Sequence, residues 1–501
     1  MHLMRILALA GLLFIPRVDI AADKKTLLDA LTAAEKDAVI DKALKALCTN
    51  DDPAVAAALG ELYEKAVELL RTNQKDVLRW AKEMEDQKIV YDAQGRYIRG
   101  RADLYGKAEE QWNFAKQRTT RLDYWTPRLA AALMDLKTEN QQAGVLKIFS
   151  TSGDFYVRGC AALALGKTES KDALEALITA AKKETESSIR VALLDALASR
   201  AKDNKDVSDF VLACASAGDW QVQVTAYKVL KQAPNKAATQ MIINSLKGAG
   251  GRIRNEANDA LMAITGVNKH GDYEAWKTWW DKNGAAFMDG TYVANPAERA
   301  DARGGSAFYG VAVTSTRVVF LVDTSGSMSE KPTWVPQDFA AVFKGEPTRL
   351  DVLKYELKKM LQSLPDNTDF NLINFHTFVL PYQPKLVRMD SGQRKKAIAW
   401  VEALPFGIGT VTWDGIDECY REAGGNFFAK NVSTSLDTIY LMSDGIPEGG
   451  VNDTKTFGEK LAAINRFKKI VIHTIAVDPP PGGEDFMKMV AETTGGTYVR
   501  R

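Results

Sequence analysis

One stretch of the sequence places an acid and two hydroxyls at alternate positions directly after an apolar run. The run is residues 318–322, and Asp323, Ser325 and Ser327 follow it. Five consecutive apolar residues are typical of a strand that is buried on both faces inside a parallel sheet. Ligands of open α/β sheets bind at the carboxyl ends of the strands, so we expect these side chains to converge there. Hard oxygen ligands of this kind suit Mg²⁺ better than Zn²⁺ or copper.

Two further stretches extend this pattern. Residues 439–442 form a second apolar run, which ends in a serine and Asp444. If the two runs are parallel neighbours, Asp323 and Asp444 meet at the same edge of the sheet. Two carboxylates there repel each other unless a cation lies between them. Residues 405–415 read as a flexible loop that delivers a hydroxyl just before a helix.

The elements around these motifs alternate between strand and helix. Strands are expected at residues 311–313, 317–322, 369–375, 438–442, 470–477 and 497–500, with an antiparallel edge strand within 378–387. Helical patterns lie at residues 350–364, 393–404, 413–423, 456–467 and 484–493. Alternation of this kind predicts a mainly parallel, doubly wound (Rossmann-like) α/β sheet.

The combination of motifs resembles a von Willebrand factor A-type domain with a complete metal-ion-dependent adhesion site, over roughly residues 309–501. The resemblance implies metal-site positions at Asp323, Ser325, Ser327, Thr410 and Asp444. It also implies that the serines and the threonine contact the metal directly, and that the carboxylates act partly through bound water. The implied cation is Mg²⁺, or alternatively Mn²⁺ or Ca²⁺. An open coordination position would take a Glu or Asp carboxylate of a protein partner.

Other interpretations of the same residues remain open. An Asp-x-Ser-Gly-Ser turn also forms where the side chains only satisfy backbone donors. An Asp-nucleophile phosphotransferase begins similarly, but it would want a second acid at position 325, a threonine at 327 and a later lysine. Thr412 is the nearest rival to Thr410, although its spacing from Gly415 is wrong for the resemblance. His376 and His473 have no nucleophile partner evident in the sequence, so binding is favoured over catalysis.

An apolar and proline-rich insertion separates the first motif from the helix at residues 350–364. It contains Pro332, Trp334, Pro336, Phe339 and Phe343. A loop of this length beside the site either shapes the choice of ligand or covers the rim of the domain, and the sequence does not decide between the two.

The chain before residue 284 reads as helical. Residues 24–125 read as helix throughout, with a helical hairpin or short coiled coil in their polar second half. Similar helices begin around Val157, Ile189, Val222 and Ile253, which are 32, 33 and 31 residues apart. Helix pairs at a near-fixed period predict an α-solenoid, and the pattern resembles HEAT-like repeats. A short helix rich in tryptophan, within residues 270–280, is expected to cap the solenoid.

The expected organisation therefore has five parts. They are a signal peptide (1–22), an N-terminal helical region (23–123), a HEAT-like solenoid with its tryptophan-rich cap (124–283), a linker (284–305) and the A-type domain (306–501). The signal peptide is inferred from a basic start, an apolar core at residues 6–15 and small residues near 22. It predicts a secreted or periplasmic protein.

Composition narrows the classes of partner. The formal net charge is +1 and there is no long Lys/Arg run, so we expect no nucleic-acid partner. No segment after the signal peptide reaches 18 uninterrupted apolar residues, so no membrane span is expected in the mature chain. The four cysteines are far apart and suit buried free thiols better than a disulfide framework.

These features favour an exported, non-enzymatic binding protein that uses a divalent cation to coordinate a carboxylate of a protein partner. One alternative is a scaffold in which the helical repeats bind the partner and the metal is structural. A second alternative, which the residues support least, is a metal-dependent hydrolase.

Overall fold

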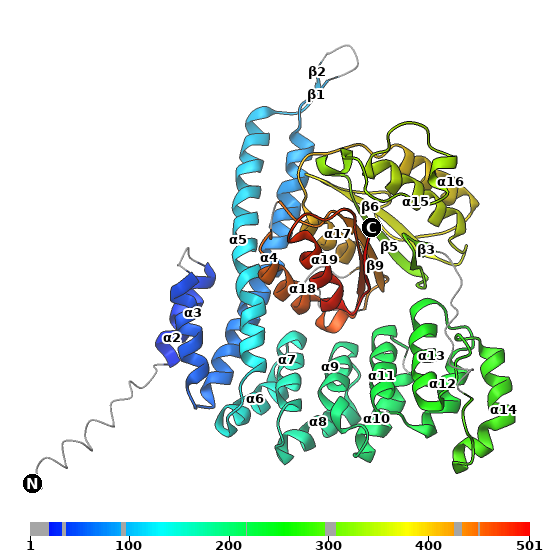
Figure 1. Cartoon of the computed structure of the whole chain (residues 1–501). Helices are drawn as coiled ribbons and strands as arrows, with labels where there is room; N and C mark the ends of the chain where they lie inside the picture. The colour runs from blue at the N-terminus through cyan, green and yellow to red at the C-terminus, as the bar shows by residue number, and fades with distance from the viewer. Residues whose placement is uncertain are drawn as a thin grey trace, which may run out of the picture. The chain divides into compact units, whose positions relative to one another are not determined.

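The computed structural model describes residues 20–501 except 33–36, 92–96, 217, 296–306, 425–432 and 449–450. The expected signal peptide thus lies almost entirely outside the described residues, as does most of the expected linker. The chain forms two compact units, Met1–Ala176 and Leu177–Arg501. In sequence terms it is a large helical region followed by an α/β domain (Figure 1).

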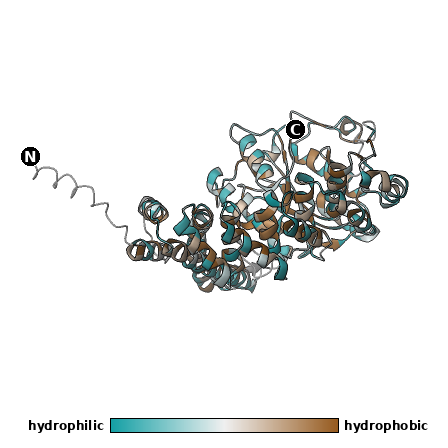
Figure 2. Ribbon diagram, turned by 90° about the horizontal axis from the view of Figure 1, so that it is seen from below, coloured by the Kyte–Doolittle hydropathy of each residue, from teal (hydrophilic) through white to brown (hydrophobic). Residues whose placement is uncertain are grey.

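The first unit is built around two long helices that lie side by side. Its helices are α2 (Ile20–Thr32), α3 (Asp37–Thr49), α4 (Ala54–Gln87), α5 (Ala102–Met134), α6 (Glu139–Thr151) and α7 (Phe155–Gly166). Figure 1 shows α4 and α5 running along each other as a helical hairpin. The hydropathy colouring of Figure 2 shows hydrophobic and hydrophilic residues alternating along the helices, as expected for helices that bury one face.

The connection between these helices corrects one expectation. A short antiparallel pair, β1 (Val90–Tyr91) and β2 (Tyr97–Arg99), joins α4 to α5, so residues 24–125 are not helical throughout. Gly100 follows with a φ of 107°, and a side chain there would meet the Lys88 carbonyl. α5 also continues to Met134, across the boundary expected at residues 123 and 124.

The second unit begins with a row of short helices. These are α8 (Lys171–Lys183), α9 (Ser187–Leu197), α10 (Lys205–Ala215), α11 (Trp220–Gln232), α12 (Thr239–Ser245), α13 (Gly251–Thr265) and α14 (Tyr273–Asp289), with 3-10 turns η1 (Ala198–Arg200) and η2 (Lys236–Ala238). α9 packs on α11 and α11 packs on α13, so alternate helices form one layer. The helices α7, α9, α11 and α13 start where the repeat spacing predicts.

The tryptophan-rich helix is longer than expected. α14 has 17 residues and ends at Asp289, so residues 284–289 are helical and not linker. The helix continues because its second half has its own buried anchor: Phe287 is buried and packs on Trp279. Trp276 is buried too, and its indole N–H donates to Asn258 Oδ1 (3.0 Å). Gly290, in the left-handed conformation, then ends the helix.

The C-terminal α/β domain is organised around a seven-stranded sheet. Its strand order is β11-β10-β9-β5-β6-β7, with β8 also paired to β6. The strands are β5 (Arg317–Asp323), β6 (Asp369–Phe375), β7 (Val379–Pro381), β8 (Val387–Arg388), β9 (Thr438–Ser443), β10 (Val471–Ala476) and β11 (Tyr498–Arg500). The pairs among β5, β6, β9, β10 and β11 are parallel, whereas β7 and β8 run antiparallel to β6. The mainly parallel sheet is as the sequence predicts.

The expected strand at residues 311–313 belongs elsewhere. β4 (Val311–Ala312) pairs with β3 (Ala307–Phe308) in a separate two-stranded sheet. This hairpin lies against the main sheet, because Phe308 packs edge-on against Phe320 of β5, with ring centroids 5.5 Å apart. The single expected edge strand within residues 378–387 is likewise divided into β7 and β8.

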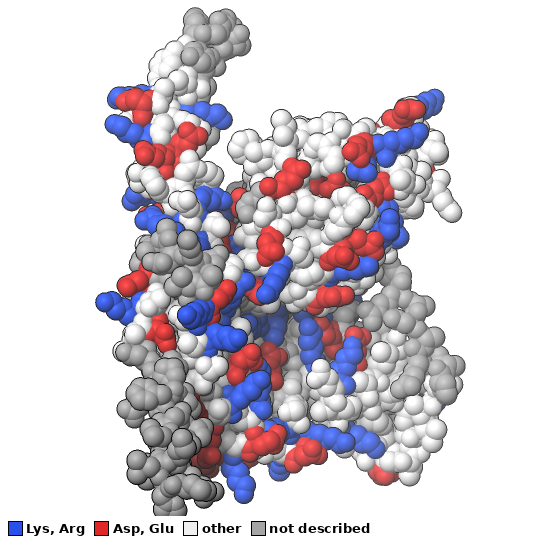
Figure 3. Space-filling view, turned by 60° about the vertical axis from the view of Figure 1, so that its left-hand side comes forward, with Lys and Arg blue, Asp and Glu red and all other residues white. Residues whose placement is uncertain are grey.

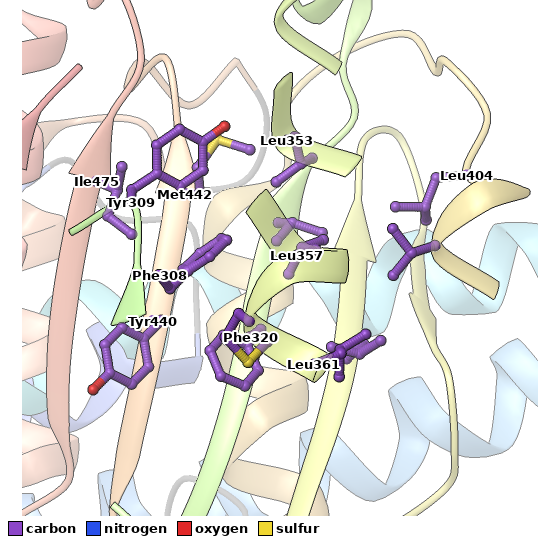
Figure 4. Close-up of a cluster of buried hydrophobic side chains, with 14 of the residues drawn as sticks. Phe308, Tyr309, Phe320, Leu353, Leu357, Leu361, Leu404, Tyr440, Met442 and Ile475 are labelled. Atoms are coloured by element: carbon purple, nitrogen blue, oxygen red, sulfur yellow. The ribbon is translucent and has the colours of Figure 1, made fainter. Parts of the chain in front are cut away.

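Helices cover both faces of the sheet. The helices of this domain are α15 (Arg349–Ser363), α16 (Ser391–Glu402), α17 (Thr412–Glu422), α18 (Thr454–Lys468) and α19 (Gly483–Thr494). Alternate residues of β5 point to opposite faces. Phe320 packs toward Leu353, Leu357 and Leu361 of α15 (Figure 4). Gly415 of α17 instead lies close to Leu321, on the other face.

Hydrogen bonds and an ion pair join the row of short helices to the amino-terminal ends of the strands. The Trp220 indole N–H donates to the Thr434 carbonyl (2.9 Å), and Arg252 donates to the Asp437 carbonyl (3.2 Å). Lys469, just before β10, pairs with Asp195 of α9 (2.6 Å). The helical row therefore contacts the amino-terminal ends of the strands, whereas Asp323 and Asp444 lie at the carboxyl-terminal ends of β5 and β9.

Replacing Phe320 by alanine tests the packing of the first face. The ring is fully buried and stacks on Tyr440 at 5.4 Å. We expect Phe320→Ala to lower the free energy of unfolding by about 3–5 kcal/mol, measured by urea unfolding. The control is Phe378→Ala, because Phe378 is 67% exposed and its loss should change stability by no more than about 0.5 kcal/mol. Equal effects would contradict this description of the core.

His473 predicts a pH dependence of stability. Burial lowers the pKa of this imidazole from 6.5 to about 4, and the Arg252 charge adds to the effect. The unfolded chain therefore binds more protons between these values, so stability falls as the pH falls through that window. We expect a loss of about 1–2 kcal/mol from His473 between pH 7 and pH 5.

The measurement compares the unfolding free energies of the wild type and His473→Asn at both pH values. The Thr497 N–H donates to His473 Nδ1 (3.0 Å), and asparagine retains an acceptor for it. The variant should lose the smaller amount of stability on acidification. Parallel pH profiles would show that His473 does not contribute.

Candidate metal centre

The candidate centre lies where the order of the sheet reverses. β5 is central, β6 follows it on one side, and β9 pairs with its other side. Such a switch point opens a crevice at the carboxyl ends of the strands. Asp323 is the last residue of β5, and Asp444 directly follows β9. The structure thus brings both acids to the same edge, as expected from the sequence.

Asp323 is fully buried and held by hydrogen bonds from two serines. Its Oδ1 accepts from the Ser325 N–H (2.8 Å) and its Oδ2 from the Ser443 hydroxyl (2.6 Å). Burial raises the pKa of this carboxyl from 3.8 to about 7, the hydrogen bonds oppose the shift, and the Asp444 charge adds to it. An anion in this position therefore lacks sufficient compensation from the protein alone. A bound cation would supply it.

The two serines of the first motif lie together on a tight turn. A 3-10 turn, η4 (Gly326–Ser329), is separated from the end of β5 by two residues, with Ser325 at its N-cap, and Ser325 Oγ lies 3.1 Å from Ser327 Oγ. Ser325 is buried, whereas Ser327 is half-buried and so lies nearer the surface. The i, i+2 spacing thus produces two adjacent hydroxyl oxygens beside Asp323.

The loop that carries Thr410 is attached to the other parts of the site by backbone hydrogen bonds. The Gly407 N–H donates to the Thr324 carbonyl (2.7 Å), and the Val411 N–H donates to the His376 carbonyl (3.0 Å). The Thr410 carbonyl accepts from the Glu448 N–H (3.0 Å), in the loop after Asp444. A side chain at Gly407 would collide with the His376 ring, so the close approach requires glycine. Thr410 is thereby held between the two acidic motifs.

The rival hydroxyl, Thr412, has a different environment. It is the first residue of α17 and is completely buried. Its hydroxyl has no hydrogen-bond partner among the residues that the structure describes. Thr410 precedes it in the loop and is almost as well buried, with 4% of its surface exposed. Burial alone therefore does not show which of the two threonines would bind the metal. Substituting each of them distinguishes the two.

An arginine that the sequence did not single out lies beside the acids. Arg349, the first residue of α15, is 3.7 Å from Asp444 and 3.3 Å from Asp478. It also pairs with Glu330 (3.0 Å) and donates to the Ser327 carbonyl (3.2 Å). Its guanidinium thus offsets part of the negative charge at the edge. Only its place at the start of a predicted helix after the insertion could have pointed to it.

Gly445 allows the chain to turn away after Asp444. Its φ is 115°, and a side chain there would meet the Gly483 carbonyl at 2.7 Å. The left-handed conformation favours glycine and directs the following residues back toward the Thr410 loop. The glycine after the second acid is therefore part of the geometry that assembles the site.

The set of donors fits a hard divalent cation. Carboxylate and hydroxyl oxygens are the ligands that Mg²⁺ and Ca²⁺ prefer. Within the described ranges no group of three or more His, Cys, Asp or Glu side chains is placed to hold a metal. The mixed set of two acids and three hydroxyls is therefore the arrangement to consider. Asp323, Ser325, Ser327, Thr410 and Asp444 would hold the ion.

Comparison with known proteins identifies the domain. Residues 316–500 match the family model described as the von Willebrand factor type A domain. The chain is thus a large helical region followed by a von Willebrand factor type A domain. No curated protein matches this sequence.

Several solved structures are similar to this chain. One is an aerotolerance-related membrane protein from Bacteroides fragilis, at 19% identity over 37% of this chain and 90% of that one, with a TM-score of 0.26. Another is the PilB minor pilin from Streptococcus sanguinis, at 16% identity over 41% of this chain and 59% of that one, with a TM-score of 0.26. A point mutant of that pilin gives 19% identity, 37% and 56% coverage, and a TM-score of 0.27. The match spans less than two thirds of the pilin.

Two remaining observations concern other predictions made from the sequence. All four cysteines are free thiols; Cys160, Cys214 and Cys419 are buried, but Cys48 is only partly so. Among the described residues no helix combines the length and hydropathy needed to cross a bilayer.

Neutralising Asp323 should stabilise the metal-free chain. Asparagine keeps an acceptor for the Ser325 N–H but removes the buried charge and its repulsion with Asp444. We expect Asp323→Asn to raise the free energy of unfolding at pH 8 in EDTA by about 2 kcal/mol. The measurement is urea unfolding with EDTA and again with excess Mg²⁺.

Added Mg²⁺ should stabilise the wild type and leave the variant unchanged, because the variant lacks the Asp323 carboxylate. Ser329→Ala is the matched control, since this exposed serine belongs to the same turn and its hydroxyl donates to the Gly326 carbonyl. A less stable variant in EDTA would contradict the idea that the buried charge is uncompensated.

Proposed function

We propose that this protein is an exported, non-enzymatic binding protein whose A-type domain holds a divalent cation, Mg²⁺ being the first choice. The cation would coordinate a Glu or Asp carboxylate of a protein partner. In this proposal residues 124–283 are the HEAT-like repeats, as their sequence spacing suggests. The basic and apolar start of the sequence supports the proposed export.

One observation carries the proposal: a fully buried carboxylate ends the central strand, and a second carboxylate and three hydroxyls share its edge of the sheet. Two acids that repel each other destabilise the fold unless a cation compensates them. Two carboxylates just balance the charge of a divalent cation and the hydroxyls add none, so an open coordination position on the cation would remain electrophilic. A carboxylate from outside is an anionic hard oxygen donor and is therefore suited to that position.

The face of the molecule in Figure 3 is consistent with a protein partner. Lys and Arg side chains are interspersed with Asp and Glu on the face shown in Figure 3. A surface of mixed sign gives little non-specific attraction for nucleic acid. Recognition would therefore depend on the local chemistry of the site.

A scaffold remains the second candidate, and a groove in the first unit favours it. A space of about 600 Å³ lies between α4, α6 and α7. Small and apolar residues dominate its lining, among them Ala57, Gly60, Ala143, Gly144 and Ile148. In that alternative the groove takes the partner and the metal only stabilises the domain. The variants below separate the two candidates.

We expect Thr410→Ala and Asp444→Ala each to weaken Mg²⁺ binding at least about tenfold without unfolding the domain. Each removes one oxygen donor from the proposed set, and a lost charged or direct ligand costs about 1.4 kcal/mol or more. Isothermal titration of the full chain with Mg²⁺ measures the affinity, and circular dichroism measures the fold.

Thr412→Val is the matched control for the threonine, because it keeps the shape of a buried side chain and removes only the hydroxyl. Its Mg²⁺ affinity should equal that of the wild type. A loss in Thr412→Val with none in Thr410→Ala would assign the metal to the other threonine. Unchanged affinity in all three variants would overturn the metal site and leave the scaffold.

A further inference from the structure

The edge of the sheet that holds the candidate metal centre also exposes large apolar side chains. Phe378, Phe406, Ile408 and Ile446 are 67%, 49%, 83% and 41% exposed. We call these four residues the apolar rim. They make up four of the seven exposed large apolar side chains in the described part of residues 307–501, the others being Val335, Val342 and Leu380. Single exposed apolar residues are ordinary, but a group of this kind marks an interaction surface.

Backbone contacts tie the first member of the rim to the site. Phe378 lies on the turn after β6, where its carbonyl accepts from the His376 N–H (3.0 Å). The His376 carbonyl in turn accepts from the N–H of Val411, next to Thr410. Register places Phe375, the end of β6, opposite Asp323. This turn is therefore a direct neighbour of the first acid.

The other three members belong to the loops that carry the proposed ligands. Phe406 adjoins Gly407, whose N–H donates to the Thr324 carbonyl (2.7 Å). Ile408 lies two residues before Thr410, and its carbonyl accepts from the Thr377 hydroxyl. Ile446 lies two residues after Asp444. All four apolar side chains thus come from the turns that enclose the centre.

Phe378 and Ile408, the two most exposed members of the rim, contribute little to the packing of this chain, whereas Phe406 and Ile446 are about half buried. Glycines set the paths of two of these loops, at Gly407 beside His376 and at Gly445 beside Gly483. Ile408, at 83% exposure, leaves most of its apolar area in water. Burying this apolar area against another molecule would be favourable.

Charged side chains near the apolar rim limit the kinds of partner that could bind there. The loop after Asp444 also carries Glu448, an exposed acid whose carboxylate lies near Gly409. Arg349, a cation beside the acids, is already engaged with Asp444, Asp478 and Glu330. A segment with several acids would meet repulsion from Glu448. A single acid between uncharged neighbours would meet less, because the cation would compensate its one charge.

We propose that the partner of this site is a protein segment in which one Glu or Asp is flanked by bulky apolar side chains. The acid would reach the cation while its neighbours cover the apolar rim. This inference rests on the proposed function and adds the chemistry of the partner. Complementarity supports it on both counts, a carboxylate for the cation and apolar groups for the rim.

The test uses the full chain and three synthetic peptides coupled to a biosensor surface. The first has a central Glu with Leu or Phe on both sides, the second has the same Glu with Ser neighbours, and the third has Gln between the apolar neighbours. Binding is measured in Mg²⁺ and in EDTA. We expect the first peptide to bind in Mg²⁺ at least about tenfold more tightly than the other two, and to be released by EDTA.

The double variant Phe378→Ser with Ile408→Ser should reduce this preference to less than about threefold and leave Mg²⁺ affinity unchanged. Val342→Ser is the matched control, because Val342 is 68% exposed but lies in the insertion, and it should keep the full preference. Equal Mg²⁺-dependent binding of the Leu/Phe and Ser peptides would overturn the rim and spare the proposed function. Equal binding of the Gln peptide would reveal apolar adhesion alone and overturn the coordination of a carboxylate, which is part of the proposed function. Absence of any Mg²⁺-dependent binding would overturn both.

Discussion

The structure depends on a carboxylate buried at the end of the central strand. Asp323 cannot avoid burial, because β5 pairs on both sides and helices cover both faces of the sheet. A buried charge is tolerated only where hydrogen bonds and opposite charge compensate it. Ser325 and Ser443 donate to Asp323, and the charge of Asp444 opposes them. Arg349 offsets part of the negative charge at these strand ends, and the glycines let the surrounding turns approach Asp323 and Asp444 closely.

The two ends of the parallel strands have different surroundings. At the amino-terminal ends, Trp220 and Arg252 of the helical row bond to carbonyls before β9. At the carboxyl-terminal ends, loops held by glycines and backbone hydrogen bonds surround the acids. In the second unit, the helical row thus packs at the amino-terminal ends of the strands, and the two acids lie at the carboxyl-terminal ends. The division follows from the parallel sheet, because parallel strands deliver all their carboxyl ends to one side.

Prediction from the sequence failed where contacts with residues outside a segment decided its structure. Residues 284–289 were expected to be linker because small and polar residues dominate the stretch, yet Phe287 packs on Trp279 and extends α14. Residues 311–313 have the pattern of a strand of the main sheet, but Val311 and Ala312 pair with β3, whose Phe308 covers Phe320. The polar region before α5 conceals a hairpin followed by Gly100 at a positive φ. None of these contacts has a signature within its own segment.

The sequence by itself determined the five parallel strands and five helices of the α/β domain and the candidate ligands, because buried strands, amphipathic helices and Asp-x-Ser-x-Ser turns are set by local residue order. Spacing alone also located the start of each repeated helix. Only the tertiary structure decided that Arg349 lies beside Asp444, that the Thr410 loop is held by Thr324, and that four apolar side chains surround them. These neighbours come from turns far apart in the chain. Their proximity arises from the order of strands at the switch point, which no single segment encodes.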